Sequence, residues 1–208
     1  RDSVASRGLG DVYKRQHEDH IGAIPWLLKL RPDIPIVASR FTIALIAAKC
    51  KEHRQKPKFV EVNEKSDVNY GSFRCRFWAV NHSVPDALGI MLGTPAGNII
   101  HTGDIKLDQT PLDNRPTDLP ALSRYGDEGV DLMLCESTNA NIPGVSASEG
   151  DIPATFRRLV SNAKQRVIIA TFASNVYRVQ AAIDAAVYAG RKVAFNGRSM
   201  TVSYTHLT

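Results

Sequence analysis

Apolar and polar positions along the chain change period several times, and each change predicts a new helix or strand. The run IGAIPWLLKL favours a helix, in whose first turn Pro25 is tolerated. IPIVAS predicts a strand, and FTIALIAAKCKEH predicts a helix because its apolar residues recur about every 3.6 positions. KFVEV and FRCRFWAV follow as strands. The alternation from Phe73 to Phe77 predicts that one face of the second strand is solvated.

The middle of the chain predicts a hairpin, a loop and a further strand. ALGIMLG and GNIIHTG flank Thr94-Pro95-Ala96-Gly97, a turn-forming sequence. Residues 108–120, rich in Pro, Asp and Arg, predict a loop, and VDLMLCE predicts a short buried strand.

From Gly150 the pattern changes, so we predict a domain boundary there. DIPATFRRLVSNAK, RVIIATF, NVYRVQAAIDAAVYAG and RKVAF alternate helix with strand, and the continuously apolar strands are typical of a parallel sheet. Ser174 and Asn175 could contact a substrate, but they fit the N-cap of the last helix equally well. The whole chain is therefore predicted to be α/β.

The two ends of the chain do not follow these patterns. Residues 1–16 and residues 202–208 show neither helical nor strand periodicity. We predict that they are a non-native leader and a non-native tail. A pair of flexible native termini is the alternative.

Composition narrows the class of protein. With 208 residues, 43% of them hydrophobic and 23% charged, the chain resembles a soluble globular protein. It contains no apolar stretch near the ~20 residues that span a bilayer. Three separated cysteines, Cys50, Cys75 and Cys135, indicate reduced thiols and a cytoplasmic location. Cys75 alternates with phenylalanines and is predicted to be buried. The net charge of +5 suits a polyanion-binding enzyme without identifying one.

A dense set of metal-binding residues stands at the start of the patterned region. His17, Asp19 and His20 fall within four positions, and imidazoles with carboxylates are the ligands of hydrolytic zinc sites. Two ions would need more ligands, which His82 in NHSVPDALG and Asp104 in HTGD could supply from strand ends. Each motif alone also fits a solvated turn or a packing histidine. Their occurrence in order, with strands between them, favours a metal site.

Other catalytic motifs do not fit. GVSAS lacks the second glycine of a G-x-S-x-G nucleophile elbow, and the sequence has no phosphate-binding P-loop or G-x-G-x-x-G.

Six motifs together carry a resemblance to a known family: HEDHIGAIPWLL, VNHSVPDALG, HTGDIKLD, CESTNANIPG, ATFASNVYRVQ and GRSM. The chain resembles the metallo-β-lactamase-fold nucleases of the β-CASP group, and most of all the ribonuclease J family. The resemblance implies a partial metallo-β-lactamase αββα sandwich over residues 17–150 and the start of a β-CASP α/β domain over residues 151–201.

The resemblance also implies roles for individual residues. His17 and His82 would bind one Zn2+ ion, Asp19 and His20 the other, and Asp104 would bridge the two. Asp19 and Glu136 would be the catalytic carboxylates, with Glu136 orienting a catalytic histidine; a loop carboxylate is the alternative for Glu136. The family motif reads H-x-H-x-D-H, and Arg15 stands where its first histidine is expected. Arginine cannot donate a lone pair to zinc, so Arg15 fits the non-native leader.

The implied activity is hydrolysis of RNA phosphodiester bonds, both 5′→3′ exonucleolytic and endonucleolytic. The implied substrate is single-stranded RNA with a 5′-monophosphate end, and the intact family enzyme would be a homo-oligomer. The 208-residue chain as written is expected to be inactive. The alternatives are a β-CASP nuclease acting on DNA or on mRNA 3′-ends, and a catalytically dead RNA-binding fragment.

Overall fold

The computed structural model describes residues 18–197, with side chains from His20 onward. Arg15, His17 and both ends predicted to be non-native lie outside this range. The chain divides into two compact units. The sheet unit comprises Ile34–Ala48 and Pro57–Gly150, and the helical unit comprises the rest. No helix within residues 18–197 has the length and hydropathy needed to cross a membrane.

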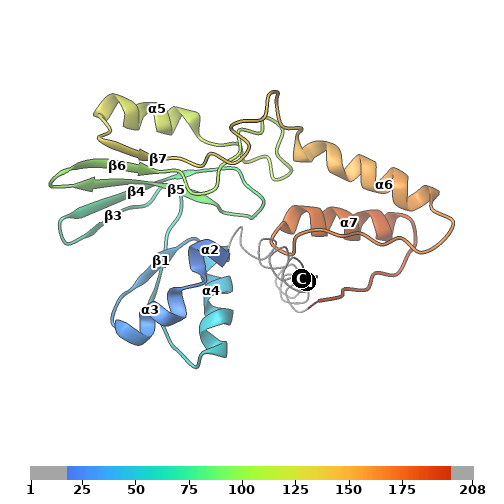
Figure 1. Ribbon diagram of the computed structural model, residues 1–208, viewed down its shortest axis with the longest axis horizontal. Coiled ribbons are helices and arrows are strands. Elements are labelled where there is room, and N and C mark those ends of the chain that lie inside the picture. The colour runs from blue at the N-terminus through green and yellow to red at the C-terminus, as the bar shows by residue number, and fades with distance from the viewer. Residues whose placement is uncertain (1–17, 198–208) are drawn as a thin grey trace, which may run out of the picture. The chain divides into compact units, whose positions relative to one another are not determined.

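The sheet unit is built on a five-stranded sheet in the order β3-β4-β5-β6-β7 (Figure 1). Its strands are β3 (Asp67–Tyr70), β4 (Phe73–Ala79), β5 (Leu88–Thr94), β6 (Gly97–His101) and β7 (Leu132–Leu134). Neighbours are antiparallel except β6 and β7, which are parallel. The predicted hairpin is confirmed as β5–β6, whereas β3 was not predicted. Because β4, β6 and β7 run in one direction, their carboxyl ends lie at one edge of the sheet.

A two-stranded parallel sheet completes this unit. It pairs β1 (Ile36–Ala38) with β2 (Phe59–Glu61), both predicted as strands. Val37 of β1 and the buried Val62, which follows β2, pack with Cys75 and Phe77 on one face of the large sheet. The prediction that Cys75 is buried is therefore confirmed.

Helix α5 (Leu119–Glu128) lies along the opposite face of the large sheet (Figure 1). Its buried Ala121 packs with Trp78, which is fully buried on β4. Because α5 covers this face of β4, the face is solvated only at Arg74, and the prediction of a solvated face is wrong for the rest of the strand. The sequence also did not predict α5, although Asp118 caps it by accepting a hydrogen bond from the Ala121 N–H at 2.9 Å.

Polar contacts join α5 to β4 on that covered face. The guanidinium group of Arg76 donates to both carboxylate oxygens of Glu128, at 2.8 and 2.6 Å. The same guanidinium lies 4.9 Å from the centre of the Tyr125 ring, which meets Trp78 edge-on. The bidentate geometry aligns the end of α5 with the middle of β4.

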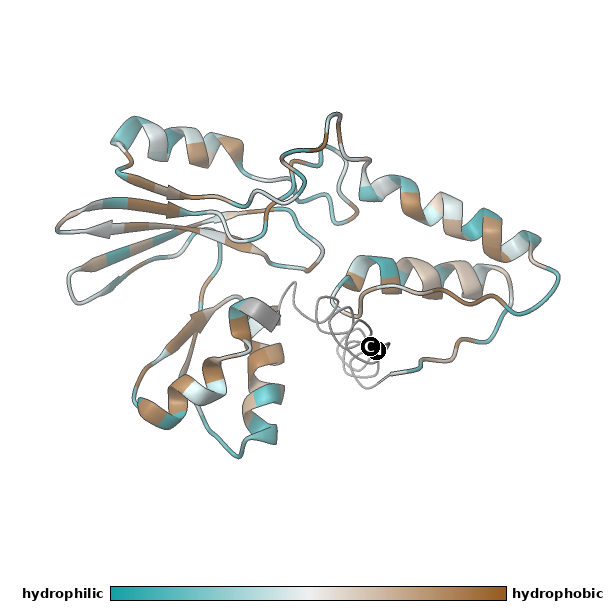
Figure 2. Cartoon of the chain, in the orientation of Figure 1, coloured by the Kyte–Doolittle hydropathy of each residue, from teal (hydrophilic) through white to brown (hydrophobic). Residues whose placement is uncertain are grey.

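Strand β7 corrects another prediction. It was predicted to be buried, but Leu132, Met133 and Leu134 are 48%, 50% and 46% exposed. The reason is that β7 is the outermost strand on its side of the described sheet and has no neighbour beyond it in residues 18–197. Figure 2 shows it as a hydrophobic strand.

The helical unit contains the remaining helices. Near its start lie α2 (Glu18–Ile21) and α3 (Ile24–Leu30), and α3 has Pro25 in its first turn. Helix α4 (Arg40–Glu52) begins in the sheet unit and ends in this one. After the short 3-10 turn η1 (Glu149–Asp151) come α6 (Ile152–Asn162) and α7 (Val176–Tyr188), which pack side by side (Figure 1). All four predicted helices are confirmed.

Asn175 is the N-cap of α7, because its side chain accepts a hydrogen bond from the Arg178 N–H at 3.1 Å. The capping interpretation of this residue is therefore confirmed.

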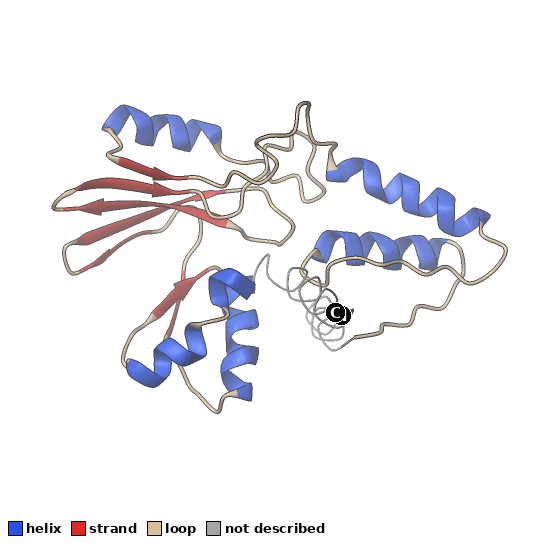
Figure 3. Cartoon of the chain, in the orientation of Figure 1, coloured by secondary structure: helices blue, strands red, loops and turns tan. Residues whose placement is uncertain are grey.

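The two strands predicted between and after α6 and α7 do not form. Residues 166–172 and 191–195 have no strand pairing and are drawn as loop in Figure 3. Strands are stabilised by ladders to a neighbour, and the described residues offer these segments none. Ile168 is accordingly 87% exposed. Arg191, at the start of the second segment, donates to the carbonyls of Ala163 and Gln165, which lie just before the first segment.

Gly89→Ala should destabilise the large sheet. Gly89 on β5 is the cross-strand partner of Trp78, and a Cβ there would overlap the buried indole ring. We expect the free energy of unfolding to fall by about 1–3 kcal/mol. Hydrogen exchange of the β4 and β5 amides measures the loss of unfolding free energy in the large sheet. The matched control is Gly93→Ala on the same strand, where the nearest atom to the new Cβ is 3.5 Å away. Equal loss in both variants would contradict the packing account.

The Arg76–Glu128 pair should make stability depend on pH. The hydrogen bond from Arg76 holds the pKa of Glu128 below its usual 4.5. A carboxylate with a lowered pKa stabilises the fold above the unfolded-state value and loses that contribution as the pH falls through the folded-state value. Glu128→Gln should therefore cost about 0.5–1 kcal/mol near neutral pH, and the difference should shrink below pH 4.5. Urea unfolding across this pH range tests it, with Asp127→Asn as the control.

Candidate functional site

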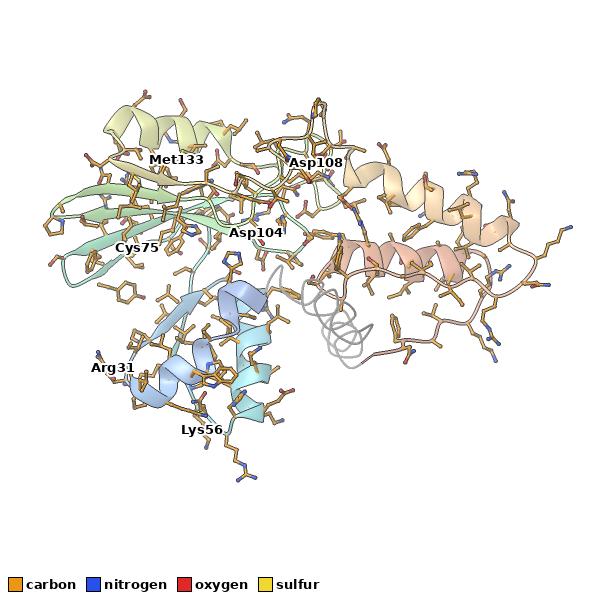
Figure 4. The ribbon with its side chains drawn as sticks, in the orientation of Figure 1. Arg31, Lys56, Cys75, Asp104, Asp108 and Met133 are labelled. Carbon is orange, nitrogen blue, oxygen red and sulfur yellow. The ribbon has the colours of Figure 1, made fainter. Side chains whose placement is uncertain are left out.

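Three of the predicted site residues follow the carboxyl ends of parallel-running strands. His82 comes three positions after β4, Asp104 three after β6, and Glu136 two after β7. His82 Nε2 lies 3.4 Å from Asp104 Oδ2, and both side chains are mostly buried. Figure 4 places Asp104 beyond the strand ends and Met133 on β7. The strand order thus brings together residues that are more than twenty positions apart in sequence.

A tight turn presents Asp104 at this edge. Gly103 has φ +62°, a conformation that glycine adopts without strain. Its N–H donates to His101 Nδ1 at 2.9 Å, and its carbonyl accepts from the buried Thr102 hydroxyl at 2.8 Å. His101 therefore has a structural role here, because its ring nitrogen accepts a backbone hydrogen bond of this turn.

Glu136 holds the far side of the same turn. Its Oε2 accepts the Ile105 N–H at 2.6 Å, and its own N–H donates to Thr102 Oγ1 at 3.3 Å. The carboxylate thus fixes the backbone beside Asp104. This contact matches the alternative interpretation of Glu136, that of a loop carboxylate.

The chain after Asp104 is anchored by a second carboxylate, Asp108, which Figure 4 labels. Burial favours the neutral form of Asp108, but hydrogen bonds from the Glu149 N–H, Ser148 and the Thr110 N–H, with the charge of Lys106, leave its pKa below the usual value. Lys106 Nζ lies 3.6 Å from Asp108 Oδ2. The ionised Asp108 therefore fastens residues 148–150 to the loop after the site.

Two of the remaining predicted ligands, Asp19 and His20, belong to the helical unit. Asp19 and His20 lie in α2, and the His20 side chain is exposed. His17 and the side chain of Asp19 lie outside what the structure describes. Among the described side chains, no three His, Cys, Asp or Glu residues form a group able to hold a metal ion. The His82–Asp104 pair supplies one imidazole and one carboxylate, the two ligand types that zinc takes in hydrolytic sites, so this pair fits the metal by ligand type.

Comparison with known proteins shows which protein family part of the chain resembles. A family model described as "Ribonuclease J, beta-CASP domain" matches residues 164–206. This part of the chain is therefore similar to the β-CASP domain of ribonuclease J.

The particular relatives are named Ribonuclease J. The chain is 77% identical over 189 residues to that of Corynebacterium glutamicum, covering 91% of this chain and 26% of the relative. It is 64% identical to that of Mycobacterium tuberculosis, covering 91% of this chain and 34% of the relative. It is 40% identical to that of Helicobacter pylori over 95% of this chain and 29% of the relative. The resemblance to ribonuclease J is confirmed. The chain spans about a quarter to a third of the length of these relatives.

One solved structure shows the same fold. A protein of unknown function from Enterococcus faecalis has a TM-score of 0.56 and 17% sequence identity to this chain, and the match covers 80% of this chain and 47% of the other.

Removing the Glu136 carboxylate should loosen the Asp104 turn. Glu136→Ala takes away the acceptor of the Ile105 N–H, and a hydrogen bond to a charged group contributes about 1.5–3 kcal/mol. Exchange of the Ile105 amide should accelerate at least about tenfold, and Glu136→Gln, which keeps an oxygen there, should be affected less. The Lys106 amide, which donates to the Asn81 carbonyl at 2.8 Å, is the internal control. Unchanged exchange at Ile105 would contradict this role for Glu136.

Proposed function

We propose that this chain supplies part of the active site of a zinc-dependent ribonuclease of the metallo-β-lactamase fold. His82 and Asp104 would be metal ligands within the sheet unit, and His17, Asp19 and His20 would complete the set, with Asp19 also acting in catalysis. The substrate would be single-stranded RNA, cleaved by 5′→3′ exonuclease and endonuclease activity.

The observation that supports this most is the approach of His82 Nε2 to Asp104 Oδ2 at 3.4 Å. An imidazole and a carboxylate from two different strand ends face each other at the edge where β4, β6 and β7 finish. The high identity to proteins named Ribonuclease J favours RNA over the alternative of a β-CASP nuclease acting on DNA or on mRNA 3′-ends.

The residues of this chain would each have a limited task in the reaction. His82 would present Nε2 as a neutral nitrogen donor, and Asp104 has two carboxylate oxygens that can serve two ions. Glu136 keeps the Asp104 backbone in place through the Ile105 N–H. Zinc held by these residues would lower the pKa of a bound water, so that hydroxide, the nucleophile for phosphorus, would be available near neutral pH, and it would offset charge on the phosphate.

Metal-binding titrations of the 208-residue chain test the proposal. Affinity for Zn2+, or for Co2+ as a spectroscopic substitute, should fall at least about tenfold in His82→Ala and Asp104→Ala, because each removes a ligand. His53→Ala is the control, since it removes an imidazole that packs against Trp26 in the helical unit and is not proposed as a ligand. Its metal affinity should change by less than about twofold.

Cleavage of 5′-monophosphorylated single-stranded RNA is the second measurement. We expect no cleavage by the 208-residue chain itself. Zinc-dependent cleavage that disappears in His82→Ala would contradict that expectation and would mean that this chain is catalytic on its own. RNA binding with neither zinc affinity nor cleavage would instead support the catalytically dead RNA-binding alternative. If the parent, His82→Ala and Asp104→Ala had the same metal affinity, the proposed metal site would be wrong.

A further inference from the structure

The strand ends that carry His82 and Asp104 are joined by a single buried hydroxyl group, that of Thr117. Thr117 is 7% exposed and lies in the loop just before α5. Its Oγ1 accepts the Asn81 N–H at 2.9 Å and donates to the Lys106 carbonyl at 2.9 Å. Asn81 directly precedes His82, and Lys106 is two residues after Asp104, so the hydroxyl bridges the two segments that carry the proposed ligands.

A backbone hydrogen bond closes the same bridge. The Lys106 N–H donates to the Asn81 carbonyl at 2.8 Å, and these two residues form an isolated β-bridge outside the named strands. With Thr117, the Asn81 N–H and carbonyl and the Lys106 N–H and carbonyl all have partners. A hydroxyl can donate and accept at once, whereas a methyl group of the same size could do neither.

The segment around Thr117 is itself fixed to the end of β4. The Asp118 N–H donates to the Ala79 carbonyl at 2.9 Å. Arg115 donates to the Ala87 carbonyl at 3.0 Å and to the Val80 carbonyl at 3.4 Å. These contacts hold both ends of the loop that carries His82, so Thr117 approaches the bridge from a rigid support.

We propose that Thr117 is a positioning residue of the candidate metal site, setting the distance between the His82 and Asp104 segments without binding the metal. The inference rests on the proposed function for the identity of the site. It adds a residue that belongs to none of the metal-binding motifs in the sequence.

The test compares Thr117→Val, which keeps the shape and removes the hydroxyl, with Thr117→Ser, which keeps the hydroxyl. Without metal, exchange of the Asn81 and Lys106 amides should accelerate at least about tenfold in the valine variant. The NMR signals of the His82 ring should also move toward those of the exposed His101 ring. Both measurements should return close to the parent values in Thr117→Ser. Affinity for Co2+ should fall about 10–100-fold in Thr117→Val and recover in Thr117→Ser.

Thr94→Val is the matched control. The Thr94 hydroxyl donates to the Gly97 carbonyl at 2.8 Å in the β5–β6 turn, at the opposite end of the sheet. The same hydroxyl accepts the Ala96 N–H at 3.1 Å, so this variant, like Thr117→Val, removes two hydrogen bonds of a threonine hydroxyl from the sheet unit. Its His82 signals and Co2+ affinity should nevertheless match the parent. If Thr94→Val changed them as much as Thr117→Val, the effect would be general destabilisation and the proposal would be wrong.

The outcomes separate this inference from the proposed function. His82 ring signals that are unchanged in Thr117→Val would overturn the positioning role, whatever the metal does. Co2+ affinity that is lost in His82→Ala but kept in Thr117→Val would overturn the positioning role and leave the metal site standing. Shifted His82 signals in a chain whose metal affinity is insensitive to His82→Ala would support the positioning role and overturn the metal site.

Discussion

The shared direction of β4, β6 and β7 is the constraint on which the candidate site depends. In a sheet, strands that run the same way deliver the residues after them to the same edge. Because β5 returns antiparallel between β4 and β6, and β7 adds in parallel, three loops widely separated in sequence meet there. Any change in this strand order would separate His82 from Asp104 and leave Glu136 without the Ile105 amide.

The proposed metal ligands at these strand ends could be predicted from the sequence, but the residues and the helix that hold them in place could not. His82 and Asp104 stood out because an imidazole and a carboxylate directly follow apolar strands. Thr117 gave no such signal, since a hydroxyl in an irregular loop acts through backbone groups that carry no residue-specific pattern. Helix α5 was missed although its start has a recognised signature: Asp118 is followed by Pro120, in the first turn. The density of Pro and Asp in residues 108–120 favoured a loop.

The failures in the helical unit have a different physical origin. Periodicity reports what a segment prefers locally, and the helices there formed because their hydrogen bonds are internal. Residues 166–172 and 191–195 have the composition of buried strands, but a strand needs a partner for its backbone groups. The same reasoning explains β7: its apolar residues favoured burial, but its place at the end of the strand order leaves it exposed, so the prediction of a buried strand was wrong.

Strand β7, the outermost strand of the sheet on its side, affects how this chain behaves in solution. One side of its backbone faces no other strand of the described sheet, and Leu132, Met133 and Leu134 put apolar groups on both of its faces. Such an edge can be extended by a strand from another molecule. That association is bimolecular and grows with protein concentration, so dilute samples are the right choice whenever a property of the isolated monomer is wanted.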